Sequence, residues 1–324
     1  MSSAILLVGG MGTRLQPLTF NTPKPMLSVA GVPFTEHQII KAREAGFTEI
    51  VLATSFKAEL FEPYFGDGER FGISIRYAVE SVPLGTGGAI RNAASMLTGS
   101  GPVAIFNGDV LSAHDLAAQL SFHVKNQADV TLYLTEVPDA RAFGAVEFGD
   151  DFRVTAFNEK MENPPTNMIN AGCYIFSREV IDSIPAQQVI SVERETFPGL
   201  LNDGARVFAF IDRNYWLDIG NPSALMKATR DLLSGAMYSA ATPVLSDGSF
   251  IAAGASIAAT AKITSSVIGS GAQIASGAVI EGCLIGAGAR VGQEVVLTDC
   301  FVADSAQVES GVIAGGSFLG FPLK

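Results

Sequence analysis

Glycines and two cations follow the first apolar segment of the chain. Residues 4–8 are apolar and long enough for a strand, and the glycines come directly after them. The residues in question are Gly9, Gly10, Gly12, Arg14 and Lys24. Glycine lets a backbone approach a ligand closely, because no Cβ stands in the way. Successive free N–H groups in such a loop form a concave anion site, to which the two side chains add positive charge. This stretch predicts phosphate binding.

The glycine spacing differs from two well-known phosphate loops. The dinucleotide fingerprint G-x-G-x-x-G is followed by an acidic residue roughly 20 positions later, and the P-loop ends in Gly-Lys-Ser/Thr. Neither pattern fits this sequence. A tight strand-to-helix turn would explain the glycines alone. It would not explain Thr13 and Arg14 directly after them, or Lys24 between Pro23 and Pro25.

A carboxylate follows another apolar strand at Asp109, in the order Phe106-Asn107-Gly108-Asp109. In phosphate chemistry Mg²⁺ is typically held by one or two carboxylates together with substrate oxygens, a role that Asp109 fits. Taken alone, Asn-Gly-Asp is also a common turn sequence.

Strand and helix patterns alternate through the first half of the chain. We expect helices at 34–45, 58–65, 86–97 and 113–126, and strands at 49–54, 73–79, 103–106 and 130–134. Such alternation predicts an α/β domain, a mostly parallel sheet with helices on both faces. Ligands of such sheets bind outside the carboxyl ends of the strands. After residue 135 the strands have longer loops, and we expect helices at 191–201 and 222–234.

A repeat of short apolar steps occupies the C-terminal part. Aliphatic residues recur at spacings of six, six and five, a trio that repeats three times before it breaks. They are Ile251, Ile257, Ile263, Ile268, Ile274, Ile280, Ile285, Val291, Leu297, Val302, Val308 and Ile313. A hexapeptide period is typical of a parallel β-helix, with about 17 residues per coil and the aliphatic residues pointing into a stacked core. We therefore expect domains at 1–240 and 241–324.

Composition excludes several classes of protein. The net charge of −11 argues against general binding of nucleic acid or anionic membranes. No apolar segment reaches the about 18 residues of a membrane span, and the start of the chain lacks a signal-peptide pattern. The three cysteines form no CxxC pair, so a disulfide framework or zinc site is not expected. We expect a cytoplasmic protein that binds neither nucleic acid nor membrane.

The glycine loop with Arg14 and Lys24 resembles the signature of the sugar-1-phosphate nucleotidyltransferase family. Within it the chain is most similar to bacterial mannose-1-phosphate guanylyltransferases (GDP-mannose pyrophosphorylases) with a C-terminal β-helix. The resemblance implies a Rossmann-like mixed sheet flanked by helices, followed by a left-handed hexapeptide-repeat β-helix. It also implies a reaction between a nucleoside triphosphate and a sugar 1-phosphate.

The family pattern assigns roles to residues of this chain. It implies catalytic roles for Arg14 and Lys24, and Mg²⁺ bound by Asp109 and Asp218. The nucleotide-binding positions it implies are Gly9, Gly10, Gly12, Thr13, Glu80, Pro83, Gly85 and Thr86. The positions for the sugar phosphate are Gly144, Glu159, Lys160 and Asn170.

The residue at position 80 bears on the base. Many relatives that use thymine or uracil carry Gln here, which both donates and accepts, whereas Glu80 as a carboxylate only accepts hydrogen bonds. Guanine offers two adjacent N–H donors, so Glu80 favours GTP. An exposed Glu leading into a turn is the simpler alternative.

The most favoured function is transfer of a nucleoside monophosphate from GTP to mannose 1-phosphate, with release of pyrophosphate. One alternative is a thymidylyl- or uridylyltransferase acting on glucose 1-phosphate. Another is a non-catalytic regulatory subunit that binds nucleotide sugar. No histidine follows His123, so an acyltransferase site on the β-helix is not expected; we expect a homo-oligomer in which that repeat is an oligomerising module. Motifs alone leave the sugar open.

Overall fold

The computed structural model describes residues 2–322. They form two compact units. One contains the chain up to Met11 together with Gln38–Trp216, and the other contains Gly12–His37 together with the chain from Leu217 onward. The domain boundary at residue 240 stays a prediction. No helix within residues 2–322 is both long and apolar enough to cross a membrane.

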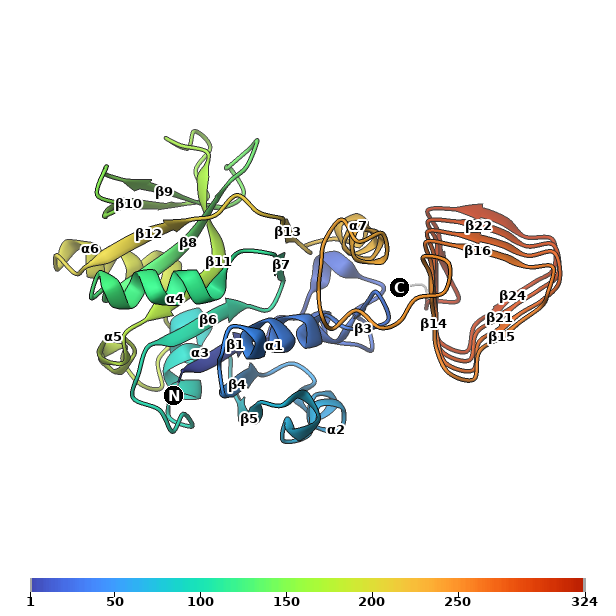
Figure 1. Cartoon of the computed structure of the whole chain (residues 1–324), viewed down its shortest axis with the longest axis horizontal. Helices are drawn as coiled ribbons and strands as arrows, with labels where there is room; N and C mark the ends of the chain where they lie inside the picture. The colour runs from blue at the N-terminus through green and yellow to red at the C-terminus, as the bar shows by residue number, and fades with distance from the viewer. Residues whose placement is uncertain (1, 323–324) are drawn as a thin grey trace. The chain divides into compact units, whose positions relative to one another are not determined.

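A mixed sheet of nine strands forms the centre of the first unit (Figure 1). The strands are β1 (Ser3–Leu7), β4 (Glu49–Thr54), β5 (Ser74–Val79), β6 (Val103–Asn107), β8 (Val130–Glu136), β9 (Gly144–Phe148), β10 (Val154–Glu159), β11 (Met168–Phe176) and β12 (Val207–Ile211). Their order is β10-β9-β11-β6-β1-β4-β5, and β8 pairs with β11 and β12. Strands β4 and β6 run parallel to β1, whereas β11 runs antiparallel to β6. The expected mixed α/β sheet is confirmed.

Helices cover both faces of this sheet, as expected. They are α1 (Phe34–Glu44), α2 (Glu62–Phe65), α3 (Gly85–Ala94), α4 (Leu116–Lys125), α5 (Arg178–Ser183) and α6 (Phe197–Asn202). Successive strand residues point to opposite faces. Leu132 of β8 therefore joins a core with Ile90 of α3 and Phe197 of α6, whereas Thr131 forms hydrogen bonds with Gln119 and His123 of α4 on the other face.

Two expected helices are interrupted, each beside a proline. The segment 58–65 is a 3₁₀ turn (Ala58–Leu60) followed by α2, which has Pro63 in its first turn. The segment 191–201 begins as a π turn (Val192–Thr196), and α6 follows with Pro198 in its first turn. Proline is tolerated at a helix start but lacks the N–H that a helix interior needs. Each proline therefore starts a new helix.

Helix α4 starts later than expected, at Leu116 rather than Ala113. The side chain of Asp115 accepts a hydrogen bond from the N–H of Ala118 at 2.8 Å, which makes Asp115 the N-cap.

In the second unit, Gly12–His37 forms two 3₁₀ turns (Thr13–Leu15 and Lys24–Met26), a short pair of strands and the start of α1. The strands are β2 (Ser28–Val29) and β3 (Val32–Pro33). Downstream, β13 (Trp216–Asp218) precedes α7 (Pro222–Leu233), whose N-cap Asn221 accepts from the N–H of Ala224 at 2.9 Å.

The C-terminal repeat forms three parallel sheets, as expected for a hexapeptide β-helix (Figure 1). The first sheet contains β14 (Phe250–Ile251), β17 (Val267–Ile268), β20 (Leu284–Ile285), β23 (Phe301–Val302) and β26 (Phe318–Leu319). The second contains β15 (Ser256–Ile257), β18 (Gln273–Ile274), β21 (Arg290–Val291) and β24 (Gln307–Val308). The third contains β16 (Lys262–Thr264), β19 (Val279–Glu281), β22 (Val296–Thr298) and β25 (Ile313–Gly315). Ile251 pairs with Ile268 and Ile268 with Ile285, which confirms the coil length of about 17 residues.

One predicted core residue of the β-helix is wrong. Ile313 is 80% exposed. Ala314, not Ile313, is in register with Leu297 and packs against the stacked core. Six residues separate Val308 from Ala314, so the coil keeps its period and places a small residue at the inward position. Ile313 stands one position earlier, and successive strand side chains point to opposite faces. The other predicted aliphatic residues belong to the core or pack against it.

Cys283 and Cys300 are buried free cysteines at equivalent positions of successive coils, 17 residues apart. The N–H of Cys300 donates to Sγ of Cys283, and the N–H of Cys283 donates to Oγ of Ser266, each 17 residues away. Burial raises the pKa of Cys283 to about 12. The thiol groups of these cysteines form hydrogen bonds with backbone groups that are buried at these positions of the coils.

Candidate active site

The glycine loop begins in the first unit. The hydroxyl of Ser55 donates to the carbonyl oxygen of Gly9 at 2.7 Å, and a Cβ on Gly9 would lie 2.6 Å from that hydroxyl oxygen. A Cβ on Gly10 would meet nothing within 4 Å. Packing therefore requires glycine at position 9, whereas the space beside Gly10 is open to a ligand.

The loop continues in the second unit, where Gly12 lies against Lys24. Gly12 has a φ of 61°, and its carbonyl oxygen accepts a hydrogen bond from the hydroxyl of Thr19 at 2.9 Å. A Cβ at this position would lie 2.8 Å from the Cβ of Lys24. Both the left-handed conformation and the close approach require glycine here. Thr13 and Arg14 follow in the 3₁₀ turn.

Arg14 and Asp218 lie against the same glycine in this unit. A Cβ on Gly220 would be 3.1 Å from Oδ2 of Asp218 and 3.3 Å from Nη1 of Arg14. The positive charge of Arg14 therefore partly compensates Asp218. The sequence predicts Asp218 as a metal ligand and does not predict this neighbour.

Glu80 follows β5 in the first unit and is half-buried. The N–H of Leu84 donates to Oε2 at 3.3 Å, whereas Oε1 is buried and accepts no hydrogen bond from any residue in 2–322. Burial raises the pKa of this carboxyl above its ordinary value, although the bond from Leu84 acts in the opposite direction. A buried acceptor without a donor is costly. The orphaned oxygen is available to a donor from a ligand.

The glycines after Glu80 have a packing reason of their own. Cβ atoms on Gly85 and Gly88 would lie 2.5 Å from the carbonyl oxygen of Ile190 and 2.4 Å from that of Gln188. The start of α3 thus packs directly against the backbone of 188–190, and the N–H of Gly87 donates to the carbonyl of Ile190 at 2.8 Å. A nucleotide-binding role for Gly85 and for the exposed Pro83 stays a prediction.

A polar network joins Thr86 to the predicted sugar residue Asn170. The hydroxyl of Thr86 donates to Oε2 of Glu193 at 2.8 Å and accepts from the N–H of Val192 at 2.8 Å. The hydroxyl of Tyr174 lies 3.5 Å from Oε1 of Glu193 and accepts from Nδ2 of Asn170 at 3.0 Å.

Tyr174 also connects this network to the residue two positions before Asp109, because its hydroxyl lies 3.4 Å from Oδ1 of Asn107. Burial raises the pKa of the fully buried Tyr174 well above its ordinary value, so it remains a neutral donor. Sequence reasoning missed Tyr174 and Asn107, and it left the charge of Glu193 without a role. One indication in the sequence is that Asn170 and Tyr174 are four positions apart in one strand. Strand residues an even number of positions apart point to the same face.

The four predicted sugar-phosphate residues gather on neighbouring strands. Gly144 pairs with Glu159 across β9 and β10, and a Cβ on Gly144 would lie 3.0 Å from Oε2 of Glu159. Lys160 forms a 3.2 Å ion pair with Glu159. Asn170 follows Ile169, which pairs with Ala145 on β9. The carboxylate of Glu159 and the ammonium of Lys160 are in contact, and the amide of Asn170 belongs to β11, the second strand from β10; such groups can bind hydroxyls and a phosphate.

Trp216 packs beside these strands. Its indole N–H donates to the carbonyl of Ala171 at 3.0 Å, and its ring contacts Phe143 edge-on with centroids 5.4 Å apart. These contacts give Trp216 a packing role.

Asp109 lies in the turn between β6 and β7 (Val110–Ser112). The N–H of Gly108 donates to the carbonyl oxygen of Leu7 at 3.0 Å, and a Cβ on Gly108 would lie 2.3 Å from that oxygen. Within residues 2–322, no group of three or more His, Cys, Asp or Glu side chains could hold a metal. One or two carboxylates completed by substrate oxygens suit Mg²⁺, so the donors present fit a magnesium ion that arrives with a nucleotide.

The three histidines are buried. His37 and His123 lie on helices, and His114 precedes α4. Burial lowers the pKa of His37 and His123 to about 4 and that of His114 well below its ordinary value. They are neutral near pH 7.

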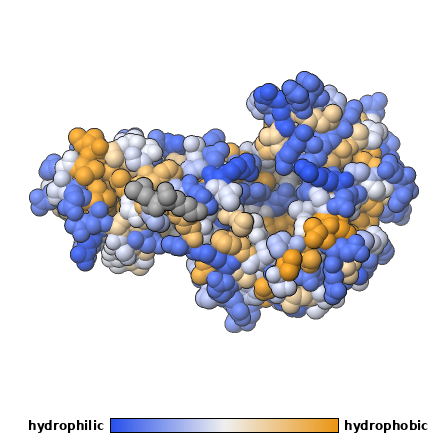
Figure 2. All heavy atoms as spheres, turned by 180° about the vertical axis from the view of Figure 1, so that it is seen from behind, coloured by the Kyte–Doolittle hydropathy of each residue, from blue (hydrophilic) through white to orange (hydrophobic). Residues whose placement is uncertain are grey.

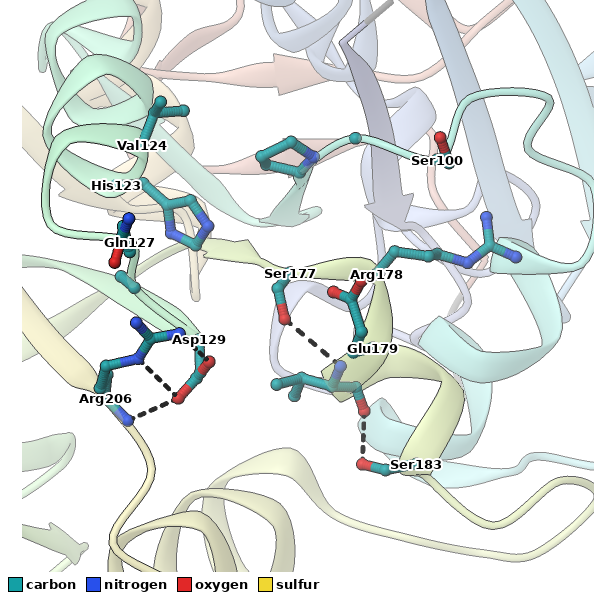
Figure 3. Close-up of a pocket in the computed structure, with 14 residues that line it drawn as sticks. Ser100, His123, Val124, Gln127, Asp129, Ser177, Arg178, Glu179, Ser183 and Arg206 are labelled. Carbon is teal, nitrogen blue, oxygen red and sulfur yellow. Dashed lines mark hydrogen bonds and ion pairs between the residues drawn. The ribbon is translucent and has the colours of Figure 1, made fainter.

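A cavity of about 670 Å³ in the first unit involves none of the predicted site residues. It lies between the end of α4, the start of α5 and the loop before β6. Figure 3 shows the ion pair of Asp129 with Arg206 at its wall. The candidate site is therefore defined by side chains at strand ends and not by this cavity.

Two family models match the chain over most of its length. The model described as nucleotidyl transferase matches residues 3–235, and the one described as GlmU-like C-terminal hexapeptide matches residues 239–317. The chain belongs to the nucleotidyl transferase family.

Particular relatives agree with this assignment. A mannose-1-phosphate guanylyltransferase of Mycobacterium tuberculosis is 51% identical over 233 residues, which are 72% of this chain and 65% of that protein. The match thus spans just under two thirds of the relative's length. A probable mannose-1-phosphate guanylyltransferase 2 of Oryza sativa is 35% identical over 80% of this chain and 72% of its own length.

A solved structure, HddC from Yersinia pseudotuberculosis complexed with GMP-PN, is similar with a TM-score of 0.61 and 29% identity. The similarity covers 71% of this chain and 99% of that one. A putative glucose-1-phosphate thymidylyltransferase from Bacillus anthracis shares the fold, with a TM-score of 0.65 at 22% identity over 71% of this chain and 94% of that one.

Proposed function

We propose that this protein is a mannose-1-phosphate guanylyltransferase. A phosphate oxygen of mannose 1-phosphate attacks the α-phosphorus of GTP in line. The bond from that phosphorus to the oxygen bridging to the β-phosphate breaks, and pyrophosphate leaves with the electron pair. The nucleophile is already anionic, so no general base is needed, and neutral buried histidines are compatible with this. A reaction that consumes GTP also fits the cytoplasmic location expected from the sequence.

The observation that carries the choice of base is the orphaned Oε1 of Glu80. Guanine presents N1–H and N2–H side by side, and a carboxylate can accept from both. The buried oxygen without a donor would gain one when guanine binds. The identity with curated guanylyltransferases supports the same base.

Phosphate handling is assigned to residues of the glycine loop and to two carboxylates. Arg14 binds the departing pyrophosphate end, and Lys24 neutralises oxygens around the reacting phosphorus. Asp109 and Asp218 are the proposed magnesium ligands. When bound, Mg²⁺ supplies charge compensation at the phosphates, as in phosphoryl transfer generally. Thr13 and the backbone of Gly10 and Gly12 contribute donors to the same phosphates.

The sugar phosphate is assigned to the strands β9, β10 and β11. Glu159 accepts from sugar hydroxyls, Asn170 donates and accepts, and Lys160 pairs with the phosphate. Gly144 is assigned to the sugar ring, which can approach the backbone closely where no Cβ stands. Mannose is the choice favoured by the relatives.

One assay tests the proposal. Purified protein with Mg²⁺ is given each nucleoside triphosphate with mannose or glucose 1-phosphate, and pyrophosphate release is measured. GTP with mannose 1-phosphate should give the highest kcat/KM. Preference for UTP or dTTP with glucose 1-phosphate would support the alternative thymidylyl- or uridylyltransferase. No turnover with any pair would leave only a non-catalytic binding subunit.

We also propose self-association through the β-helix. Figure 2 shows hydrophobic residues gathered in a narrow strip on that part of the molecule. On the outer face of the third sheet, Val279, Val296 and Ile313 stand in register on successive coils, and Ile313 is 80% exposed. Light scattering of the full chain and of an Ile313→Lys variant tests this, because the charge should reduce the association.

A further inference from the structure

The segment that carries Asp109 is held by side chains of α1. Strand β6 lies in the nine-stranded sheet, but β7, on the other side of Asp109, lies outside it. Buried backbone groups are nearly always hydrogen-bonded, and three carbonyl groups of this segment have side chains as partners.

Gln38 supplies two of these partners. Its Nε2 donates to the carbonyl oxygen of Asn107 at 2.8 Å and to that of Val110 at 3.2 Å. These carbonyls lie on either side of Gly108-Asp109, so one amide group closes the turn. Gln38 is 5% exposed, and water replaces these bonds poorly at such burial.

Lys41 supplies the next partner, one helical turn along the same face of α1. Its Nζ donates to the carbonyl oxygen of Ser112 at 2.7 Å, to the Ser112 hydroxyl at 3.1 Å and to Nδ1 of His114 at 2.9 Å. An ammonium has three protons, and these contacts use them all.

The imidazole of His114, which Lys41 contacts, is itself held in place by other residues. Its Nδ1 accepts from Lys41, which places the imidazole proton on Nε2, where it donates to Oε1 of Gln119 at 3.2 Å. Its ring stacks on Tyr133 with centroids 4.0 Å apart. Asp109 thus lies in a segment tied down at three carbonyl groups by one helix.

We propose that Gln38 and Lys41 are positioning residues that hold Asp109 in the orientation needed to bind Mg²⁺ with the nucleotide. We name this pair the α1 clamp. The inference rests on the proposed function, in which Asp109 is a magnesium ligand. Partners that orient a metal ligand typically contribute about 10- to 100-fold to metal affinity or activity.

The experiment measures the affinity of the full-length protein for GTP with and without Mn²⁺, by calorimetry without the sugar phosphate. The ratio of the two dissociation constants reports contact between protein and metal and needs no turnover. Gln38→Met and Lys41→Met remove the clamp's hydrogen bonds with little change in length. Lys125→Met is the matched control, because Lys125 is exposed on α4. Asp109→Asn is the reference for loss of the metal ligand.

We expect Asp109→Asn to abolish the gain from Mn²⁺, and each clamp variant to reduce it about 10-fold while the affinity for metal-free GTP stays as in wild type. The clamp is overturned if Asp109→Asn loses the Mn²⁺-dependent increase in GTP affinity but the clamp variants keep that increase within about twofold of wild type. The proposed function would then still stand. If Asp109→Asn keeps the gain, the magnesium assignment itself is wrong, and the clamp falls with it.

Thermal unfolding monitors folding of each variant. If a Met variant does not fold, Gln38→Asn and Lys41→Arg take its place in the experiment. Each of them keeps a hydrogen-bond donor but changes the length of the side chain that carries it. A smaller Mn²⁺-dependent increase in GTP affinity in these folded variants supports the clamp, and an unchanged increase overturns it.

Discussion

The hydroxyl of Thr86 donates a 2.8 Å hydrogen bond to the carboxylate of Glu193. The other oxygen of that carboxylate lies 3.5 Å from the hydroxyl of Tyr174, which is bonded to Asn170. A residue predicted to bind nucleotide and one predicted to bind sugar therefore share one partly buried network. Removing Glu193 should disturb the binding of both substrates.

We expect Glu193→Gln to lower kcat/KM for GTP and for mannose 1-phosphate alike. A hydrogen bond to a charged group contributes about 1.5–3 kcal/mol, which corresponds to about 10- to 100-fold in rate. Steady-state kinetics with each substrate varied in turn measure this. Glu179→Gln, at an exposed position on α5, should leave both values unchanged. An effect confined to one substrate would show that the network does not couple the two.

Glu80→Gln should shift the preference among bases. An amide presents a donor where the carboxylate only accepts, so one of the guanine N–H groups loses its partner and GTP is used less well. We expect kcat/KM for GTP to fall about 10- to 100-fold and that for UTP to fall less. The ratio of the two rates measured in competition is the test. Glu59→Gln, exposed on a 3₁₀ turn, is the control; an unchanged ratio in Glu80→Gln would refute the base argument.

Periodic patterns predict this fold well. The alternation of apolar segments indicates the α/β sheet because strand and helix periods differ, and the six-six-five spacing indicates the β-helix because each coil repeats the last. Both are local properties of the sequence. The error at Ile313 arose because the predicted core followed aliphatic residues alone, whereas the coil keeps its period with Ala314.

The candidate site is less predictable, because it depends on contacts between distant segments. Gly85 resembles a ligand-binding glycine, but the structure packs it against Ile190. Tyr174 reads as one apolar residue of a buried strand, and only the fold brings it to Glu193 and Asn107. Lys41 and Gln38 read as polar residues of an amphipathic helix. No local pattern records that they reach the carbonyls around Asp109.

Acid should destabilise the protein partly through Glu49, which is 4% exposed on β4. Burial alone raises its pKa, but hydrogen bonds from Ser3, Gly99 and Thr98 outweigh burial and lower the pKa from 4.5 to about 2. A carboxyl whose pKa is lower in the folded state stabilises the fold above its unfolded pKa. That stability is lost as the pH falls from about 4.5 to about 2, and a shift of this size corresponds to about 3 kcal/mol.

Glu49→Gln should therefore lower the free energy of unfolding by about 2–3 kcal/mol at pH 7, and by progressively less as the pH approaches 2. Urea unfolding at pH 7, 4 and 3 measures the difference. Glu44→Gln is the control, since the ion pair of Glu44 with Arg43 is 3.8 Å long and the Glu44 side chain is 45% exposed. A difference between wild type and Glu49→Gln that does not change with pH would exclude ionisation of Glu49 as its cause.

The β-helix allows a matched comparison of two isoleucines on the same sheet. Ile280 is fully buried in the stacked core, whereas Ile313 is 80% exposed on the last strand of that sheet. Ile280→Ala removes buried methyl groups and leaves a cavity, which typically costs about 2–5 kcal/mol. Ile313→Ala removes a side chain that faces water in the single chain, and it should change the stability of the monomer by less than about 0.5 kcal/mol.

Hydrogen exchange of the coil amides measures this where the change occurs, because each coil contacts only its neighbours and loss of packing spreads to them first. At a concentration where the protein is monomeric, Ile280→Ala should speed exchange in β16, β19 and β22, while Ile313→Ala should leave all three at the wild-type rate. Equal acceleration in both variants would mean that position 313 faces the core, and that Ile313 and not Ala314 continues the row of inward residues in the last coil.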